Sequence, residues 1–256
     1  MKVYFIGAGP GAFDLITIRG AEILSRAQLV MYAGSLVSEQ MLRHCKANPL
    51  IVNTAKLNLE EQEQFYRMAQ ERNWDVARLH SGDPSVYGAT AEQMRRLEKL
   101  GIVYEVVPGV PSFVSAAAVL NVELTKPNIS QTVILTRLGG RASPMPAKED
   151  LSSLAAHGAT LCLFLSGANL PEVINDLLLH YPPDTPVALV QRASWPEQRV
   201  HRGCLGKLLG EIEPGSWLLT TMLLVGEVLN DATTPESRLY AADYSHRFRK
   251  ASEKGA

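Results

Sequence analysis

The sequence is poor in cysteine and has almost no net charge, and each shortage argues against a class of protein. Its three cysteines, Cys45, Cys162 and Cys204, stand singly, and no Cys-x-x-Cys or His/Cys spacing indicates a metal site. Unpaired cysteines and the lack of a recognisable signal peptide lead us to expect a cytoplasmic protein. A net charge of −1 gives no basic surface for bulk nucleic-acid binding, so no nucleic-acid partner is expected.

Long apolar runs are also missing. One long stretch without a charge, residues 106–122, contains Pro108, Gly109 and Pro111 near its start. A helix interrupted so early is a poor membrane span, and no membrane association is predicted. The chain has 256 residues, of which 46% are hydrophobic, enough for two globular domains of ordinary size.

The first half alternates short apolar runs with amphipathic stretches. Strands are predicted at 2–6, 28–32, 50–53, 74–79 and 103–107, with helices at 14–27, 59–72 and 89–100. In the first helix, Leu15, Ile18, Ile23 and Leu24 are expected to face the sheet. A helix over 113–120 follows. This alternation predicts a parallel sheet covered by helices on both faces.

A second α/β series follows a polar connection at 121–130. Strands are predicted at 132–135, 160–165, 186–191, 199–200 and 217–225, with helices at 148–156, 170–180 and 205–212. We therefore predict an α/β fold with an N-terminal domain at 1–120, a C-terminal domain at 121–230 and a polar tail at 231–256.

The glycine run after the first strand formally matches a dinucleotide-binding fingerprint. Gly7-Ala-Gly-Pro-Gly-Ala12 fits Gly-x-Gly-x-x-Ala, which makes an NAD-dependent oxidoreductase one alternative. Pro10, however, lacks the N–H that a pyrophosphate would need. The second strand also ends at Tyr32 and not at the acidic residue that holds a ribose.

A stiff polar loop follows the fourth strand. Gly82 permits a tight turn, and Pro84 fixes the backbone after Asp83 and ends the strand. Ligands of open α/β sheets bind at such carboxyl ends. The simpler alternative is an ordinary turn in which Asp83 or Ser85 caps the next helix. His80, just before the loop, is interpreted as a core histidine with its hydrogen bonds satisfied.

Three motifs in this order carry a family resemblance. Gly7-Ala-Gly-Pro-Gly11, Ser81-Gly-Asp-Pro84 and Val107-Pro-Gly-Val110 resemble the tetrapyrrole methyltransferases, which use S-adenosylmethionine. The resemblance covers essentially the whole chain. Three further stretches, at 32–37, 131–137 and 237–250, are similar to the precorrin-4 C11-methyltransferases, a group that includes the cobalt-precorrin-4 enzymes.

The resemblance implies a reaction and a cofactor site. It implies two α/β domains with a cofactor trough between them, a homodimer, and methyl transfer to C11 of precorrin-4 in cobalamin biosynthesis. S-adenosylhomocysteine would be the product. The residues expected to bind the cofactor are Pro10, Ser81, Gly82, Asp83, Val86, Pro111, Ser112, Leu165, Ala193, Thr221 and Met222. Pro111 stands where the family pattern has threonine, so a hydroxyl contact is not expected there.

The substrate side is less sharply defined by the sequence. Its candidates are Tyr32, Ser35, Arg137, Arg192 and Arg247, with Arg141 and Arg249 as further cations for carboxylates. Core packing for Tyr32, and solvated surface charge for any one arginine, stay open. Trp195 either ends a strand or walls the site, and residues 137–145 form a candidate lid.

Asp83 has two open roles, contact with the cofactor or closure of its own turn, and we expect Asp83→Ala to weaken cofactor binding more than folding. No catalytic residue is assigned, because a nucleophilic ring carbon does not require a general base. Alternatives are methylation of another ring carbon or another substrate, the NAD enzyme above, and a carrier that binds without turnover. The pattern does not decide whether the substrate carries cobalt.

Overall fold

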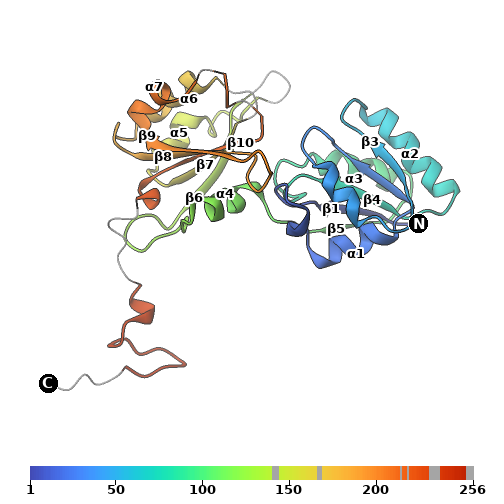
Figure 1. Ribbon diagram of the computed structural model, residues 1–256, viewed down its shortest axis with the longest axis horizontal. Coiled ribbons are helices and arrows are strands. Elements are labelled where there is room, and N and C mark those ends of the chain that lie inside the picture. The colour runs from blue at the N-terminus through green and yellow to red at the C-terminus, as the bar shows by residue number, and fades with distance from the viewer. Residues whose placement is uncertain (140–143, 166–168, 214, 218, 231–236, 252–256) are drawn as a thin grey trace. The chain divides into compact units, whose positions relative to one another are not determined.

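The computed structural model describes residues 1–139, 144–165, 169–213, 215–217, 219–230 and 237–251 (Figure 1). The chain forms two compact units. The first comprises Met1–Val119 together with Arg192–Arg199, and the second comprises Leu120–Gln191 together with Val200–Ala256. The segment Arg192–Arg199 therefore packs with the first unit although it follows a strand of the second.

The first unit is built on a parallel five-stranded sheet in the order β3-β2-β4-β1-β5 (Figure 1). Its strands are β1 (Val3–Gly7), β2 (Leu29–Tyr32), β3 (Leu50–Asn53), β4 (Val76–His80) and β5 (Tyr104–Val107). Val3 is in register with Val76 on one side and Tyr104 on the other. The carboxyl ends of β4, β1 and β5 therefore lie next to one another.

Helices cover both faces of this sheet, as the alternation predicts. On one face α1 (Ile18–Arg26) and the 3-10 helix η2 (Glu39–His44) pack on Ile6, Val30 and Leu79. On the other, α2 (Leu59–Glu71) and α3 (Thr90–Lys99) pack on Phe5 and Met31. Strands β1 and β2 are apolar throughout because their alternate side chains point to opposite faces of the sheet and pack into two separate cores.

The predicted helix at 14–27 is wrong in its first turn. A 3-10 helix η1 (Phe13–Leu15) comes first, and α1 begins at Ile18, where the Thr17 hydroxyl accepts a hydrogen bond from the Gly20 N–H at 3.1 Å. This N-cap fixes the start of the helix. Ile18 consequently points outward and is 80% exposed, whereas Ile23 and Leu24 face the core as expected.

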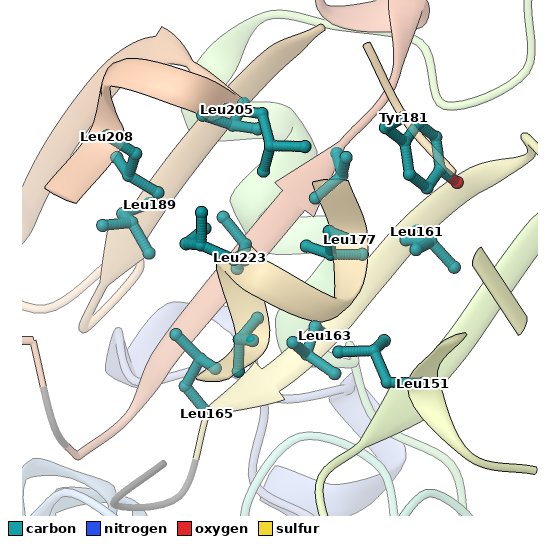
Figure 2. Close-up of a cluster of buried hydrophobic side chains, with 14 of the residues drawn as sticks. Leu151, Leu161, Leu163, Leu165, Leu177, Tyr181, Leu189, Leu205, Leu208 and Leu223 are labelled. Atoms are coloured by element: carbon teal, nitrogen blue, oxygen red, sulfur yellow. The ribbon is translucent and has the colours of Figure 1, made fainter. Parts of the chain in front are cut away.

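The second unit holds a mixed sheet in the order β6-β7-β10-β8-β9. Its strands are β6 (Val133–Arg137), β7 (Thr160–Leu165), β8 (Pro186–Gln191), β9 (Arg199–Cys204) and β10 (Thr221–Val225), and β10 runs antiparallel to both neighbours. One face is covered by α5 (Leu151–Ala155), α6 (Leu170–Leu178), η3 (Leu205–Lys207) and α7 (Leu208–Glu211). Figure 2 shows the leucine-rich core between them.

The last strand is shorter than predicted. Thr220 has a φ of +54°, which interrupts the extended backbone, so β10 begins at Thr221 and not at Trp217. Trp217 still packs into the core, which explains its apolar character without a strand. Two further short helices, η4 (Glu227–Leu229) and η5 (Arg238–Tyr240), follow β10, and α4 (Ser112–Leu120) follows β5. Within the described part of the chain, no helix is long and apolar enough to cross a bilayer.

Candidate functional site at the carboxyl edge of the first sheet

Three loops meet where β4, β1 and β5 end, and their backbones are joined by hydrogen bonds. The Ala8 N–H donates to the His80 carbonyl at 2.8 Å, and the Gly82 N–H donates to the Gly9 carbonyl at 2.8 Å. Gly9 returns a bond to the Gly82 carbonyl at 3.2 Å. The ladder between β1 and β4 therefore continues past the strands and holds the first two loops together.

Two glycines, Gly7 and Gly109, allow this close approach. A Cβ on Gly7 would lie 2.5 Å from the Gly109 Cα and 2.7 Å from the Gly82 carbonyl oxygen. A Cβ on Gly109 would collide with that same oxygen. The obstacles are backbone atoms, which cannot swing aside as a side chain can. Glycine is thus required at the ends of β1 and β5 because main chain packs directly on main chain.

Asp83 joins the second loop to the third. Its Oδ2 accepts a hydrogen bond from the Gly109 N–H at 2.8 Å, and its Oδ1 accepts from the Ser85 N–H at 2.8 Å and from the Ser85 hydroxyl. The turn-closing role of Asp83 is thereby observed. Neither Asp83 nor Ser85 caps α3, which begins at Thr90 after Ala89 in a left-handed conformation, so that alternative is wrong.

The carboxylate of Asp83 is held in its charged form. Partial burial raises its pKa, but the hydrogen bonds from Ser85 and Gly109 outweigh burial and leave the pKa below its ordinary value. These donors satisfy both carboxylate oxygens within the protein. Any bound ligand therefore meets a site whose shape Asp83 already maintains.

The segment 192–199 lies over the glycine loop of β1. The Trp195 indole N–H donates to the Pro10 carbonyl at 2.8 Å, and the Ala12 N–H donates to the Ser194 hydroxyl at 3.0 Å. The indole fills the space next to Gly11, where any Cβ would collide with it. Trp195 therefore walls the loop and does not end a strand, since β8 ends at Gln191. The sequence contains no signal that pairs Ser194 with Ala12.

These contacts argue against a dinucleotide cradle. The N–H groups of Ala8, Gly9 and Ala12 all donate within the protein, and Pro10 has none. A pyrophosphate would need such donors at a helix start. The glycine run is followed by the short 3-10 helix η1, and the first α-helix begins only at Ile18. The glycine run is used for close packing against β4 and Trp195.

The cofactor residues predicted in the first unit gather at this edge. Ser81, Gly82, Asp83 and Val86 lie in the loop after β4, and a Cβ on Gly82 would stand 3.4 Å from the Pro111 Cα and 3.5 Å from the Ser112 nitrogen. Ser112 begins α4, so its turn presents the amino end of a helix. Ser81, Asp83, Val86, Pro111 and Ser112 are half-buried, while Pro10 and Gly82 are buried.

The cofactor residues predicted in the second unit gather at one edge of its sheet. Thr221, at the start of β10, is in register with Leu165, the last residue of β7, and with Gln191, the last residue of β8. Met222 follows on the opposite face, and all three predicted residues are buried. Ala193, which was expected there too, lies two residues beyond the end of β8, in the segment Arg192–Arg199 that packs with the first unit, and not at a strand end.

The substrate candidates differ in what the structure offers. Tyr32 packs in the core, and its hydroxyl donates to Glu39 at 3.2 Å; burial and then this bond raise its pKa. The core-packing alternative accounts for Tyr32. Ser35 is exposed in the loop after β2. Arg192 lies 3.6 Å from Glu197 and stacks over Trp195.

The remaining arginines differ in exposure and in their hydrogen-bond partners. The Arg137 guanidinium, at the end of β6, donates to the Leu138 carbonyl at 2.9 Å. Arg247 is exposed beside Phe248, whereas Arg249 donates to three backbone carbonyls of the tail. Arg141 and the centre of the predicted lid at 137–145 lie outside the described residues.

A buried polar cluster lies under the second loop, on the α2–α3 face of β4. The Arg78 guanidinium donates to Thr54 at 2.9 Å, to Gln93 at 3.1 Å and to Gln62 at 3.2 Å. His80, two residues on, is buried, and its Nε2 has no hydrogen-bond partner. The interpretation of His80 as a fully satisfied histidine is therefore wrong for this nitrogen. Burial, and then the Arg78 charge, lower its pKa to about 3.

Comparisons with known proteins agree on one family. A family model for tetrapyrrole (corrin/porphyrin) methylases matches residues 2–209. A precorrin-4 C(11)-methyltransferase of Sinorhizobium sp is 48% identical over 99% of this chain and 100% of that protein. The crystal structure of a cobalt precorrin-4 methyltransferase is 40% identical with a TM-score of 0.85, covering 90% of this chain and 96% of that one.

A third comparison includes a bound ligand. The structure of a uroporphyrin-III C-methyl transferase from Thermus thermophilus, complexed with S-adenosylhomocysteine, is 27% identical with a TM-score of 0.75. The alignment covers 90% of this chain and 99% of that one. Among the described residues, no group of three or more histidine, cysteine or acidic side chains is placed to hold a metal ion.

Proposed function

Because the chain belongs to the tetrapyrrole (corrin/porphyrin) methylases, we propose that it transfers a methyl group from S-adenosylmethionine to C11 of precorrin-4 in cobalamin biosynthesis. The observation that carries the proposal is the 48% identity to a precorrin-4 C(11)-methyltransferase along almost the entire chain. Such similarity extends over both units, so it includes the three loops of the carboxyl edge and the tail.

The carboxyl edge of the first sheet suits a small polar cofactor. Ser81 and Ser112 bring hydroxyl groups to half-buried positions, and the first turn of α4 brings backbone N–H donors suited to a carboxylate. The glycine contacts and the hydrogen bonds accepted by Asp83 fix these groups before any ligand arrives. A preformed site orders fewer side chains on binding, which favours affinity.

The second unit is proposed to supply the remaining cofactor contacts. Leu165 and Thr221 are in register across β7 and β10 and are buried, and Met222 follows Thr221 in β10; an adenine slot requires such a mostly apolar lining. Ala193 leaves room for a flat ring because its side chain is small. We assign these residues, together with Pro10 and the loop residues above, to binding S-adenosylmethionine and S-adenosylhomocysteine.

The chemistry asks mainly for alignment. S-adenosylmethionine supplies an electrophilic methyl group on a sulfonium, and an electron-rich ring carbon accepts it. The residues of this chain then have to hold the two partners in line at contact distance, which can account for much of a rate enhancement. Asp83 is occupied by Gly109 and Ser85, so it is assigned to loop geometry and not to proton transfer.

We also propose an oligomeric state, a cellular location and substrate-binding residues for the enzyme. A homodimer and a cytoplasmic location remain part of it. Free Cys45, Cys162 and Cys204 are consistent with a reducing compartment. Of the substrate candidates, Ser35 and Arg247 are exposed and keep that assignment, with Arg137 and Arg192 as further cations near strand ends.

Titration calorimetry tests the cofactor assignment. We expect S-adenosylhomocysteine to bind with micromolar affinity or better and NADH to give no heat. Binding of NADH without S-adenosylhomocysteine would instead support the oxidoreductase alternative and overturn the proposal. A carrier is separated from an enzyme by incubation with methyl-labelled S-adenosylmethionine and precorrin-4: an enzyme moves the label to the tetrapyrrole, and a carrier leaves it on the cofactor.

A further inference from the structure

The C-terminal segment 237–251 forms a small folded element of its own. The Arg249 guanidinium donates to the carbonyls of Leu239 at 2.8 Å, Ala241 at 2.7 Å and Tyr240 at 3.4 Å. His246 and Arg249 exchange two backbone hydrogen bonds, at 2.8 and 3.0 Å. One arginine therefore ties the 3-10 helix η5 to the turn that follows it.

This element exposes large apolar rings. Phe248 is 86% exposed and Tyr240 is 77% exposed, and Tyr244 and Leu239 are also exposed. Large apolar side chains are costly to leave in water, so four exposed ones in a single short element indicate a partner. Because internal hydrogen bonds hold the segment in a defined fold, its aromatic rings are exposed on an ordered element.

The same element is strongly basic. Residues 237–251 contain Arg238, Arg247, Arg249 and Lys250 against a single acid, Asp243, which gives +3 in a chain whose total is −1. Arg238 lies 3.9 Å from Asp243. The Arg247 Cζ atom lies 5.5 Å from the centroid of the Phe248 ring, so the exposed surface of the segment presents a cation next to an aromatic ring.

We propose that the C-terminal segment 237–251 binds the tetrapyrrole substrate, an inference that rests on the proposed function. Its rings, Tyr240 and Phe248 first, would lie against the macrocycle, and Arg247 and Lys250 would pair with peripheral carboxylates. A tetrapyrrole, which combines a broad apolar ring face with peripheral carboxylates, matches both properties at once. The segment then contributes to substrate affinity, whereas the strand-end loops serve the cofactor.

The test compares two double variants of the full chain. In Arg247→Gln/Phe248→Ala, we expect the KM for precorrin-4 to rise about tenfold, because one stacking contact and one ion pair are lost. The kcat and the Kd for S-adenosylhomocysteine stay at wild-type values. The matched control, Arg72→Gln/Val103→Ala, removes an exposed arginine at the C-terminal end of α2 and an exposed apolar side chain just before β5, and we expect no change.

A second readout separates this inference from the proposed function. Uroporphyrin III, a fluorescent polycarboxylate macrocycle, serves as a binding probe that needs no turnover. Weaker uroporphyrin binding by Arg247→Gln/Phe248→Ala supports the inference even if wild type fails to methylate precorrin-4. An unchanged KM, unchanged uroporphyrin binding, or a change of oligomeric state in sedimentation as the main effect would overturn it, the last by assigning the rings to a second copy of the chain.

Discussion

Asp83 accepts a hydrogen bond from the Gly109 backbone N–H at 2.8 Å and thereby joins the loop after β4 to the loop after β5. These loops are 26 residues apart in the sequence and belong to strands separated by β1 in the sheet. The bond spans the strand between them, just above the point where Gly7 ends it. This carboxylate therefore links two of the three loops that form the carboxyl edge.

Because Asp83 closes its own turn, Asp83→Ala should weaken folding together with cofactor binding, and the sequence-based expectation of a larger effect on cofactor binding than on folding is revised. The variant leaves the Gly109 and Ser85 N–H groups without their acceptor, and a lost partner of this kind costs about 1–3 kcal/mol. We expect a free energy of unfolding lower by about 2 kcal/mol in urea and a weaker Kd for S-adenosylhomocysteine by calorimetry. Ser85→Ala is the control, since it removes only a hydroxyl and leaves the bond to Gly109. Wild-type stability in Asp83→Ala would show that the carboxylate does not maintain the edge.

Gly109→Ala should be far more damaging than its size suggests. The new Cβ meets the Gly82 carbonyl oxygen, so two loops must separate, and we expect at least about 2 kcal/mol of destabilisation by thermal or urea unfolding. Gly210→Ala is the matched control because no atom lies within 4 Å of its Cβ and the residue is in a short helix. There alanine should be neutral or stabilising. Equal effects at the two positions would contradict the backbone packing described here.

Gly11 and Trp195 should behave as a coupled pair. Gly11→Ala pushes the indole away and breaks its bond to the Pro10 carbonyl, whereas in Trp195→Ala the space is already empty. Each single change should therefore lower stability and S-adenosylhomocysteine affinity, and the double variant should lose clearly less than the sum. A double-mutant cycle measures this directly. Strict additivity would mean that the indole does not cover the loop in solution.

The neutral His80 should make stability depend on pH. Its pKa is lowered to about 3 in the folded protein from an ordinary 6.5. Below pH 6.5 the imidazole is therefore protonated in the unfolded chain but stays neutral in the folded chain. Stability is full above pH 6.5 and falls as the pH drops, with a slope of up to about 1.4 kcal/mol per pH unit. Carboxyl groups overlap at lower pH, so the informative window is roughly pH 5 to 6.5.

His80→Leu should flatten that slope, measured as urea stability at several pH values, and His157→Gln on an exposed turn serves as the control. Should the leucine variant fold poorly, NMR titration of the wild-type imidazole gives the same answer. A His80 resonance that titrates near pH 6.5 would contradict the buried, neutral state.

Much of the first sheet was readable from the sequence because its signals are local. The runs at β1, β2 and β4 are apolar enough to specify buried parallel strands, and Gly82 and Pro84 mark the loop by their own backbone preferences. The start of α1 was misplaced because an apolar period continues through Leu15 and Ile18, while the Thr17 cap decides where the helix begins. The start of β10 was misplaced because the positive φ of Thr220 has no composition signal.

The contacts that shape the site were not readable, because they join distant residues. Trp195 meets Pro10 across 185 positions, and Ser194 meets Ala12 across 182. No local sequence pattern predicts either contact. Asp83 could be singled out as a turn residue, but its partner Gly109 depends on the strand order. Tyr32 was a substrate candidate because it lies in the stretch 32–37, which resembles one subgroup of the family. Its side chain instead packs in the core.

The most direct test of the account is the position of the transferred methyl group. The protein is incubated with precorrin-4 and S-adenosylmethionine carrying a ¹³C-labelled methyl, and the product is examined by mass spectrometry and by NMR. We expect a single added methyl group, attached to C11. A product methylated at another ring carbon, or a tetrapyrrole recovered without the label while the cofactor stays bound, would contradict it.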